Sequence, residues 1–116
     1  MNAEIFNDYC MQKKGISQDF PFDDRILVYR VGGKIFALCE IENFDFVNLK
    51  CDPEYAIELR EQFEGIFPAY HMNKKHWNSV DVQGLVPDPL IFKLIDHSYK
   101  LVFNSLSKKL QAEIGE

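Results

Sequence analysis

The chain has 116 residues, of which 47% are apolar, and it carries a formal net charge of −5. This apolar content, which includes 10 Phe and 5 Tyr, excludes an intrinsically disordered chain, and the length is that of one domain. The negative charge excludes a uniformly basic surface, so any contact with nucleic acid must use a local group of cations. We predict a single domain over residues 1–116.

The cysteines and the apolar segments bear on the location of the protein. The three cysteines, Cys10, Cys39 and Cys51, are odd in number, lie far apart and lack the spacing of a zinc site. We interpret them as reduced, inward-facing residues. No apolar run approaches the ~20 residues of a membrane span, and the first residues lack the layout of a signal peptide. The sequence therefore predicts a cytoplasmic protein that binds no membrane and no cofactor.

The first 24 residues are predicted to form a helix followed by a loop. Apolar residues recur at helical spacing from Asn2 to Lys14, and Gly15 supplies a typical helix stop. The segment from Ile16 to Asp24 contains Pro21 between two phenylalanines, and a proline disfavours helix at the residue before it. We expect this segment to be an extended loop whose aromatic rings anchor it to the core.

A β-hairpin is the clearest local feature of the sequence. Gly32-Gly33 separates two runs rich in β-branched and aromatic residues, 25–31 and 34–41, and two glycines favour a tight turn with positive φ. The predicted register pairs Val31 with Lys34, Tyr29 with Phe36, Leu27 with Leu38 and Arg25 with Glu40. Both faces of the hairpin are apolar, so the face without helices should also be covered. We expect the Phe20-Pro21-Phe22 segment to cover it in a monomer, the alternative being a second subunit of a homodimer.

The remaining sequence predicts a third strand, a helix, a second hairpin and a long last helix. Residues 44–51 alternate in polarity, and Asp52-Pro53 then supplies a helix cap and a first-turn proline. The segment from Ile66 to Val82 contains two strand-like runs. After it, Asp88 as the cap and Pro89 as the first helical residue open a helix with a long apolar stripe. The predicted fold is therefore α+β, an antiparallel sheet with helices packed on one face, in the order α-β-β-β-α-β-β-α.

The most distinctive segment lies in the second hairpin. Two lysines, two histidines and two aromatic residues are gathered, without a carboxylate, in the run Tyr70-His71-Met72-Asn73-Lys74-Lys75-His76-Trp77-Asn78. This run resembles the signature of the MmcQ/YjbR-like family, and Pro21-Phe22, residues 31–38 and residues 98–102 stand in the order that this family shows. The resemblance implies a frataxin-like (CyaY-like) α+β sandwich and the double-wing mode of DNA binding that has been proposed for the family.

Duplex DNA is the partner that this resemblance implies, with the second hairpin as the main contact surface. The predicted contact residues belong to the two hairpins and are His71, Asn73, Lys74, Lys75, His76, Trp77, Asn78, Arg30 and Lys34. The lysines would contact phosphates, the asparagines and histidines would form hydrogen bonds to the backbone or base edges, and the tryptophan would stack on an exposed base. Two hairpin lysines alone would give a log-log salt slope of only roughly −2, so the two cations of the first hairpin should contribute.

Three other interpretations stay open at the level of the sequence. In the first, Tyr70 and Trp77 fill the core, the lysines solvate a turn, and the segment is purely structural. In the second, His71 and His76 face each other and ligate a transition metal, although no third ligand is near in sequence. In the third, the chain is a non-catalytic protein-interaction or small-ligand module. An enzyme is not expected, because the cysteines point inward and no glycine-rich phosphate loop opens a helix.

Overall fold

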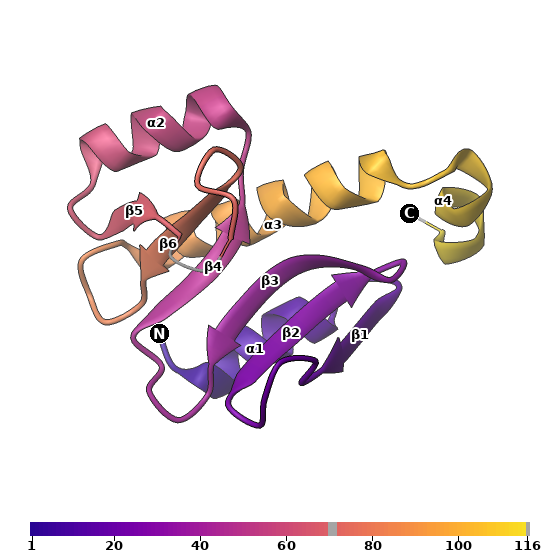
Figure 1. Ribbon diagram of the computed structural model, residues 1–116, viewed down its shortest axis with the longest axis horizontal. Coiled ribbons are helices and arrows are strands. Elements are labelled where there is room, and N and C mark those ends of the chain that lie inside the picture. Colours follow the sequence, from indigo (N-terminus) through magenta and orange to yellow (C-terminus); the bar gives the residue numbers. More distant parts are fainter. Residues whose placement is uncertain (70–71, 116) are drawn as a thin grey trace.

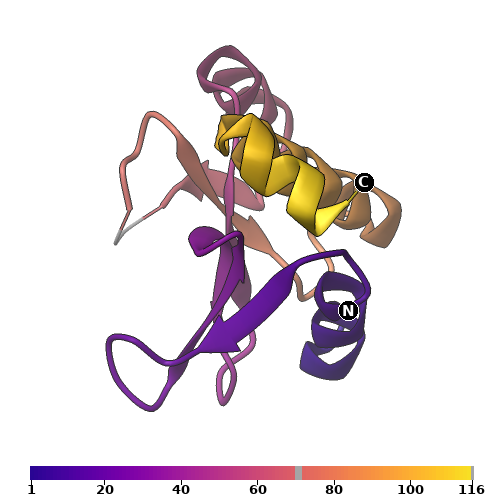
Figure 2. The same ribbon diagram turned by 90° about the vertical axis from the view of Figure 1, so that its right-hand side faces the viewer.

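Six strands form one antiparallel sheet, and helices pack against one of its faces (Figures 1 and 2). The computed structural model describes residues 1–69 and 72–115. In chain order the elements are α1 (Ala3–Met11), β1 (Ile16–Asp19), β2 (Ile26–Val31), β3 (Lys34–Glu40), β4 (Phe46–Lys50), α2 (Pro53–Gln62), β5 (Ile66–Pro68), β6 (Trp77–Asp81), α3 (Asp88–Ser105) and α4 (Lys108–Ile114). The order across the sheet is β1-β2-β3-β4-β6-β5, so β6 lies beside β4, and β5 forms an edge.

The predicted α+β class and the predicted order of eight elements are confirmed, and the structure adds a short strand and a short helix. The loop expected over residues 16–24 begins instead as β1, which pairs with β2 from Ile16↔Val31 to Asp19↔Val28. The last three residues of β1 are polar and exposed, so this edge strand lacks the apolar alternation that identifies strands in a sequence. Backbone pairing with β2 holds it in the sheet.

The first hairpin contains a β-bulge that the sequence did not reveal. Val31 pairs with Lys34 as predicted, but the register shifts after Arg30↔Ile35, so that Tyr29 pairs with Ala37. The other predicted partners are therefore wrong by one residue, and the observed pairs are Tyr29↔Ala37, Leu27↔Cys39 and Ile26↔Glu40. Phe36 is the extra residue, and its ring packs edge-on against Tyr99 of α3 at 5.5 Å between centroids.

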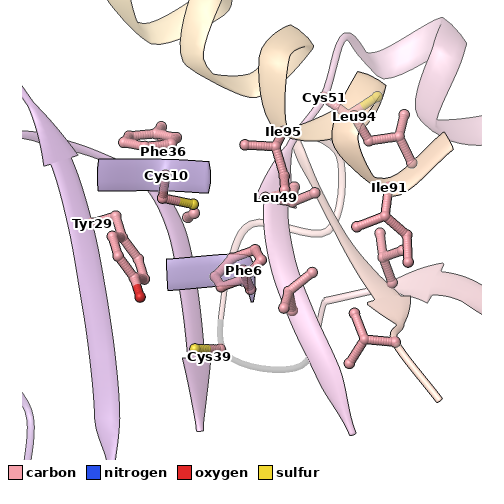
Figure 3. Close-up of a cluster of buried hydrophobic side chains, with 14 of the residues drawn as sticks. Phe6, Cys10, Tyr29, Phe36, Cys39, Leu49, Cys51, Ile91, Leu94 and Ile95 are labelled. Atoms are coloured by element: carbon pink, nitrogen blue, oxygen red, sulfur yellow. The ribbon is translucent and has the colours of Figure 1, made fainter. Parts of the chain in front are cut away.

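The core lies between the sheet and α1, α2 and α3 (Figure 3). Phe6 of α1 is fully buried at its centre, with its ring 5.6 Å from those of Tyr29 and Phe44. Ile91 and Ile95 of α3 are likewise fully buried. Burying an aliphatic or aromatic side chain of this size contributes about 1.5–3 kcal/mol, so this layer accounts for much of the stability. The predicted reduced, inward-facing cysteines are found as such, since all three are free and buried.

The second face of the sheet is only partly covered, contrary to the expectation that residues 20–22 would close it. Val28 and Leu38 are buried, but Phe20 and Phe22 are 44% and 63% exposed. Phe22 borders a cavity with Ile26, Leu38 and Met72 instead of lying across the face. Residues 20–22 follow directly after β1, which is paired with β2 at the edge of the sheet. Because this pairing fixes where the segment begins, the segment stays at the rim of the sheet.

Candidate nucleic-acid interface

The turn before β6 is held by its own backbone and by α2. The Asn73 Oδ1 atom accepts hydrogen bonds from the backbone N–H groups of Lys75 at 2.8 Å and His76 at 3.3 Å. The Arg60 guanidinium of α2 donates a hydrogen bond to the carbonyl oxygen of Lys74 at 3.1 Å. The backbone N–H of Cys51 donates to the carbonyl oxygen of His76 at 2.8 Å. The side chain of Asn73 is thus committed to the turn, as is usual for asparagine, and the two lysine side chains are exposed.

The two residues after this turn point into the protein. Trp77 is 7% exposed and Asn78 is 2% exposed, so in this conformation neither side chain is available to a base. The Asn78 Nδ2 group donates to the carbonyl oxygen of Ala56 at 3.4 Å, which ties β6 to α2. The predicted contribution of His71, and with it the alternative His71/His76 metal pair, lies outside the described residues.

The two cations of the first hairpin lie elsewhere in the molecule. The Arg30 Nε atom is 2.9 Å from Asp19 Oδ1, and Nη1 donates to the carbonyl oxygen of Gly33, so the charge of Arg30 is largely neutralised. Lys34 is exposed at the start of β3. The β2–β3 turn lies near α4, whereas the β5–β6 connection lies near α2 (Figure 1). The structure therefore divides the predicted contact residues between two separate places.

A larger group of cations surrounds a cleft between α1, α3 and the end of α4. This cleft has a volume of about 970 Å³ and is lined by four lysines, Lys13, Lys14, Lys93 and Lys100. Asp96 is the single carboxylate among its described lining residues, so four lysines against one aspartate leave a formal charge of +3. We call this feature the lysine cleft. On a protein of net charge −5, it is a strong local departure from the mean.

The floor of the lysine cleft is built from Tyr9, Lys13, Asp96 and Tyr99. The Tyr9 hydroxyl donates to both carboxylate oxygens of Asp96 at 2.8 and 2.9 Å, and Lys13 forms an ion pair with the same carboxylate. The ammonium of Lys13 lies over two rings, 4.9 Å from the centroid of Tyr9 and 5.2 Å from that of Tyr99. Burial, followed by Asp96, raises the pKa of Tyr9 to about 12, so its hydroxyl stays a donor at neutral pH.

The rim of the cleft is open to solvent. Lys93 and Lys100 are exposed and stand seven residues apart on α3, which places them on one side of that helix. His97 adds no charge at neutral pH, because burial lowers its pKa and its Nε2 atom accepts a hydrogen bond from the N–H of Asp52 at 3.2 Å. Among the described lining residues, the positive charge of the cleft therefore comes from the lysines.

The sequence does not predict this cleft, because its parts are far apart along the chain. Lys13 and Asp96 are separated by 83 residues. The available signals are the pair Lys13-Lys14 at the end of the first predicted helix and the spacing of Lys93 and Lys100 on the last one. Neither signal shows that α1 and α3 lie side by side on the sheet.

Three properties of the described residues concern thiol reactivity, metal binding and membrane insertion. Burial raises the pKa values of the Cys39 and Cys51 thiols to about 12, so both are protonated at neutral pH, and it raises that of Cys10 further. Within residues 1–69 and 72–115, no three His, Cys, Asp or Glu side chains are grouped closely enough to hold a metal ion. In the same ranges, no helix has the length and apolarity needed to cross a bilayer.

Comparisons with known proteins agree with the resemblance seen in the sequence. Residues 11–101 match the YjbR family. An uncharacterized protein named YjbR from Escherichia coli K12 is 38% identical over 102 residues, which cover 87% of this chain and 86% of that protein. The crystal structure of Deinococcus radiodurans DR2400, a DUF419 domain, is 36% identical with a TM-score of 0.93, over 98% of this chain and 88% of that one. A Pseudomonas syringae protein is 32% identical with a TM-score of 0.75, over 88% and 99% of the two chains. The chain therefore belongs to the YjbR family.

Proposed function

We propose that the protein is a non-catalytic nucleic-acid-binding protein and that the lysine cleft makes its main phosphate contacts. The observation that carries this proposal is the gathering of four lysines around one cleft of an acidic protein. Lysine ammonium groups contact phosphates as point charges, and a cleft with positive walls raises the local concentration of an anionic ligand. The raised pKa values of the buried thiols support a role without a cysteine nucleophile.

The magnitude of the salt effect favours the cleft over the hairpin. A formal charge of +3 in the cleft would give a log-log salt slope of about −2.7, at about 0.9 counterion released per phosphate neutralised. Lys74 and Lys75 alone would give about −1.8. The cleft is thus the stronger electrostatic site, and the hairpin turn with its two exposed lysines is a secondary one.

The double-wing interpretation concerns the other side of the molecule. The connections at residues 20–25 and 72–76 both project from the side of the sheet that faces away from α1 and α3 (Figure 2). The surface between these loops is lined by apolar side chains together with Glu40 and Asp45. Phosphates would be repelled by those carboxylates, so we assign the wings a minor part in binding a polyanion.

A comparison of two charge-reversed variants tests the proposal. We would measure the fluorescence anisotropy of labelled duplex and single-stranded DNA across a salt series for the wild type, K93E/K100E and K74E/K75E. Both variants change the net charge equally, so a nonspecific charge effect would alter them alike. We expect K93E/K100E to lower affinity by more than about tenfold at low salt and K74E/K75E by about threefold or less.

The opposite ranking would move the interface to the hairpin turn. Wild-type protein without salt-sensitive binding to either DNA would refute nucleic-acid binding as the function. Circular dichroism melting curves serve as the folding control, because all four lysines are exposed and the variants should melt close to the wild type.

A further inference from the structure

The sheet face opposite the helices carries a groove that the proposed function does not use. Two cavities, of about 630 and 260 Å³, share Ile26 and Leu38 among their lining residues and therefore adjoin each other. Phe46 and Phe67 line its larger part, and Phe22 and Met72 line the smaller part. We call this feature the sheet groove. Its residues come from strands β2 to β6, from the β3–β4 connection and from the two connections at 20–25 and 72–76.

The apolar side chains of the sheet groove are unusually accessible. Phe22 is 63% exposed and Phe46 is 43% exposed, and the Phe46 ring meets that of Phe67 edge-on at 5.0 Å. Contiguous exposed aromatic surface on a small domain marks a site where another molecule binds.

The charged groups among the described lining residues of the sheet groove are acidic. Glu40 and Asp45 line its larger part, and none of its described lining residues is a lysine or an arginine. The Ser79 hydroxyl donates a hydrogen bond to the Asn48 side chain, so these two lining residues need few hydrogen bonds from a partner. The surface therefore offers apolar contact area and negative charge, but few unmet hydrogen bonds.

We propose that the sheet groove binds a positively charged segment of another protein, one with apolar side chains that reach the exposed rings. Opposite charge across an interface speeds association and excludes like-charged partners. A second copy of this chain fits poorly, because face-to-face pairing would bring two sets of Glu40 and Asp45 together. The helices that carry the lysine cleft lie on one side of the sheet (Figure 2). The sheet groove belongs to the opposite face, so both ligands could bind at once. The proposal stands on different residues from the nucleic-acid proposal and does not depend on it.

Three synthetic peptides test the charge and the apolar requirement together. The first alternates leucine with lysine over seven positions, the second replaces its lysines by glutamate, and the third replaces its leucines by serine. We would titrate each peptide into ¹⁵N-labelled protein and follow the backbone amide shifts. We expect micromolar, salt-sensitive binding of the leucine–lysine peptide, with shifts concentrated in β3, β4 and β5, and at least about tenfold weaker binding of the other two.

Variants of exposed groove residues then locate the site. Glu40→Lys with Asp45→Lys should weaken binding of the leucine–lysine peptide by about tenfold or more and strengthen binding of the leucine–glutamate peptide. Phe46→Ser should weaken both, because it removes an exposed ring without opening the core. Glu54→Lys with Glu58→Lys is the matched control, because it changes the net charge by the same amount at two exposed residues of α2 that do not line the groove, and it should leave peptide binding unchanged. Wild-type-like spectra of the free variants establish that each one folds.

Several results would overturn the proposal. Equal binding of the lysine and glutamate peptides would remove the charge argument, and amide shifts centred on α1 and α3 would place the peptide at the cleft. Failure of the leucine–lysine peptide to bind would leave the groove without the predicted partner class. A dimer in sedimentation equilibrium that Phe46→Ser converts to a monomer would show that a second copy occupies the face instead.

Discussion

Replacing Asp96 by asparagine should weaken the fold slightly while strengthening the binding of a polyanion. The change keeps an oxygen for the Tyr9 hydroxyl but removes the negative partner of Lys13. The Asp96 side chain is 47% exposed, so solvent screens the ion pair, and we expect a loss of about 0.5–1 kcal/mol in the free energy of unfolding. The same change raises the formal charge of the cleft from +3 to +4.

The added charge should be visible in the salt dependence of DNA binding. The log-log slope should steepen from about −2.7 to about −3.6, and extrapolation from 1 M salt gives an affinity gain of about tenfold near 0.05 M. Urea denaturation measures the stability, and anisotropy in a salt series measures the affinity. Tyrosinate absorbance should also report a lower pKa for Tyr9, since its carboxylate neighbour is gone.

The two effects have opposite signs, which makes this test informative. A variant that is less stable and also binds DNA less tightly would indicate that binding follows the folded fraction and not the charge of the cleft. An unchanged salt slope would place the phosphate contacts outside the cleft. Asp88→Asn is a suitable control, because it also removes one carboxylate but does not line the cleft.

Three further predictions concern the fold. Phe6→Ala, at a fully buried ring, should cost about 3–5 kcal/mol in urea denaturation, whereas the neighbouring Ile5→Ala, at a side chain 46% exposed, should cost about 0.5 kcal/mol or less. Gly32→Ala should lower thermal stability more than Gly33→Ala. Both glycines have positive φ, but only at Gly32 would the added Cβ meet a side chain, 2.7 Å from Leu106 Cδ1. Equal losses of stability would contradict this packing. Burial lowers the His97 pKa, so the folded state binds its proton less readily than the unfolded state does, and stability should be lost as the pH falls below the ordinary value of 6.5. His97→Gln should flatten the dependence of the unfolding free energy on pH between about 7 and 5, and an unchanged profile would refute this assignment.

Local chemistry accounts for the parts of the fold that the sequence predicted well. Asp52 caps α2 by accepting a hydrogen bond from the N–H of Tyr55 at 3.2 Å, as its position before Pro53 predicted. Gly32 and Gly33 both take positive φ in the first hairpin turn. The predicted cap of the last helix was off by one, because Pro87 occupies the N-cap position and Asp88 is already helical. These features depend on residues adjacent in the chain, and adjacent residues are what periodicity and capping rules describe.

The features that the sequence did not predict depend on tertiary contacts. The bulge at Phe36 is selected by packing against Tyr99, a residue of the last long helix. The lysine cleft requires α1 and α3 to lie next to each other, and the burial of Trp77 and Asn78 requires a sheet behind them. A run of lysines, histidines and aromatics predicts chemistry but not which side chains face solvent. For that reason the sequence predicts contacts from Trp77 and Asn78, whose side chains the fold buries.

The lysine cleft and the sheet groove place two patches of opposite charge on a protein of modest size. Four lysines line the cleft beside α1 and α3, whereas Glu40 and Asp45 line the groove on the opposite face of the sheet. Approach to a charged surface should therefore be directional, because each patch attracts a surface of the opposite charge. Despite its net charge of −5, the protein should therefore be retained on a cation-exchange matrix at low salt through the lysine cleft. K93E/K100E should abolish that retention.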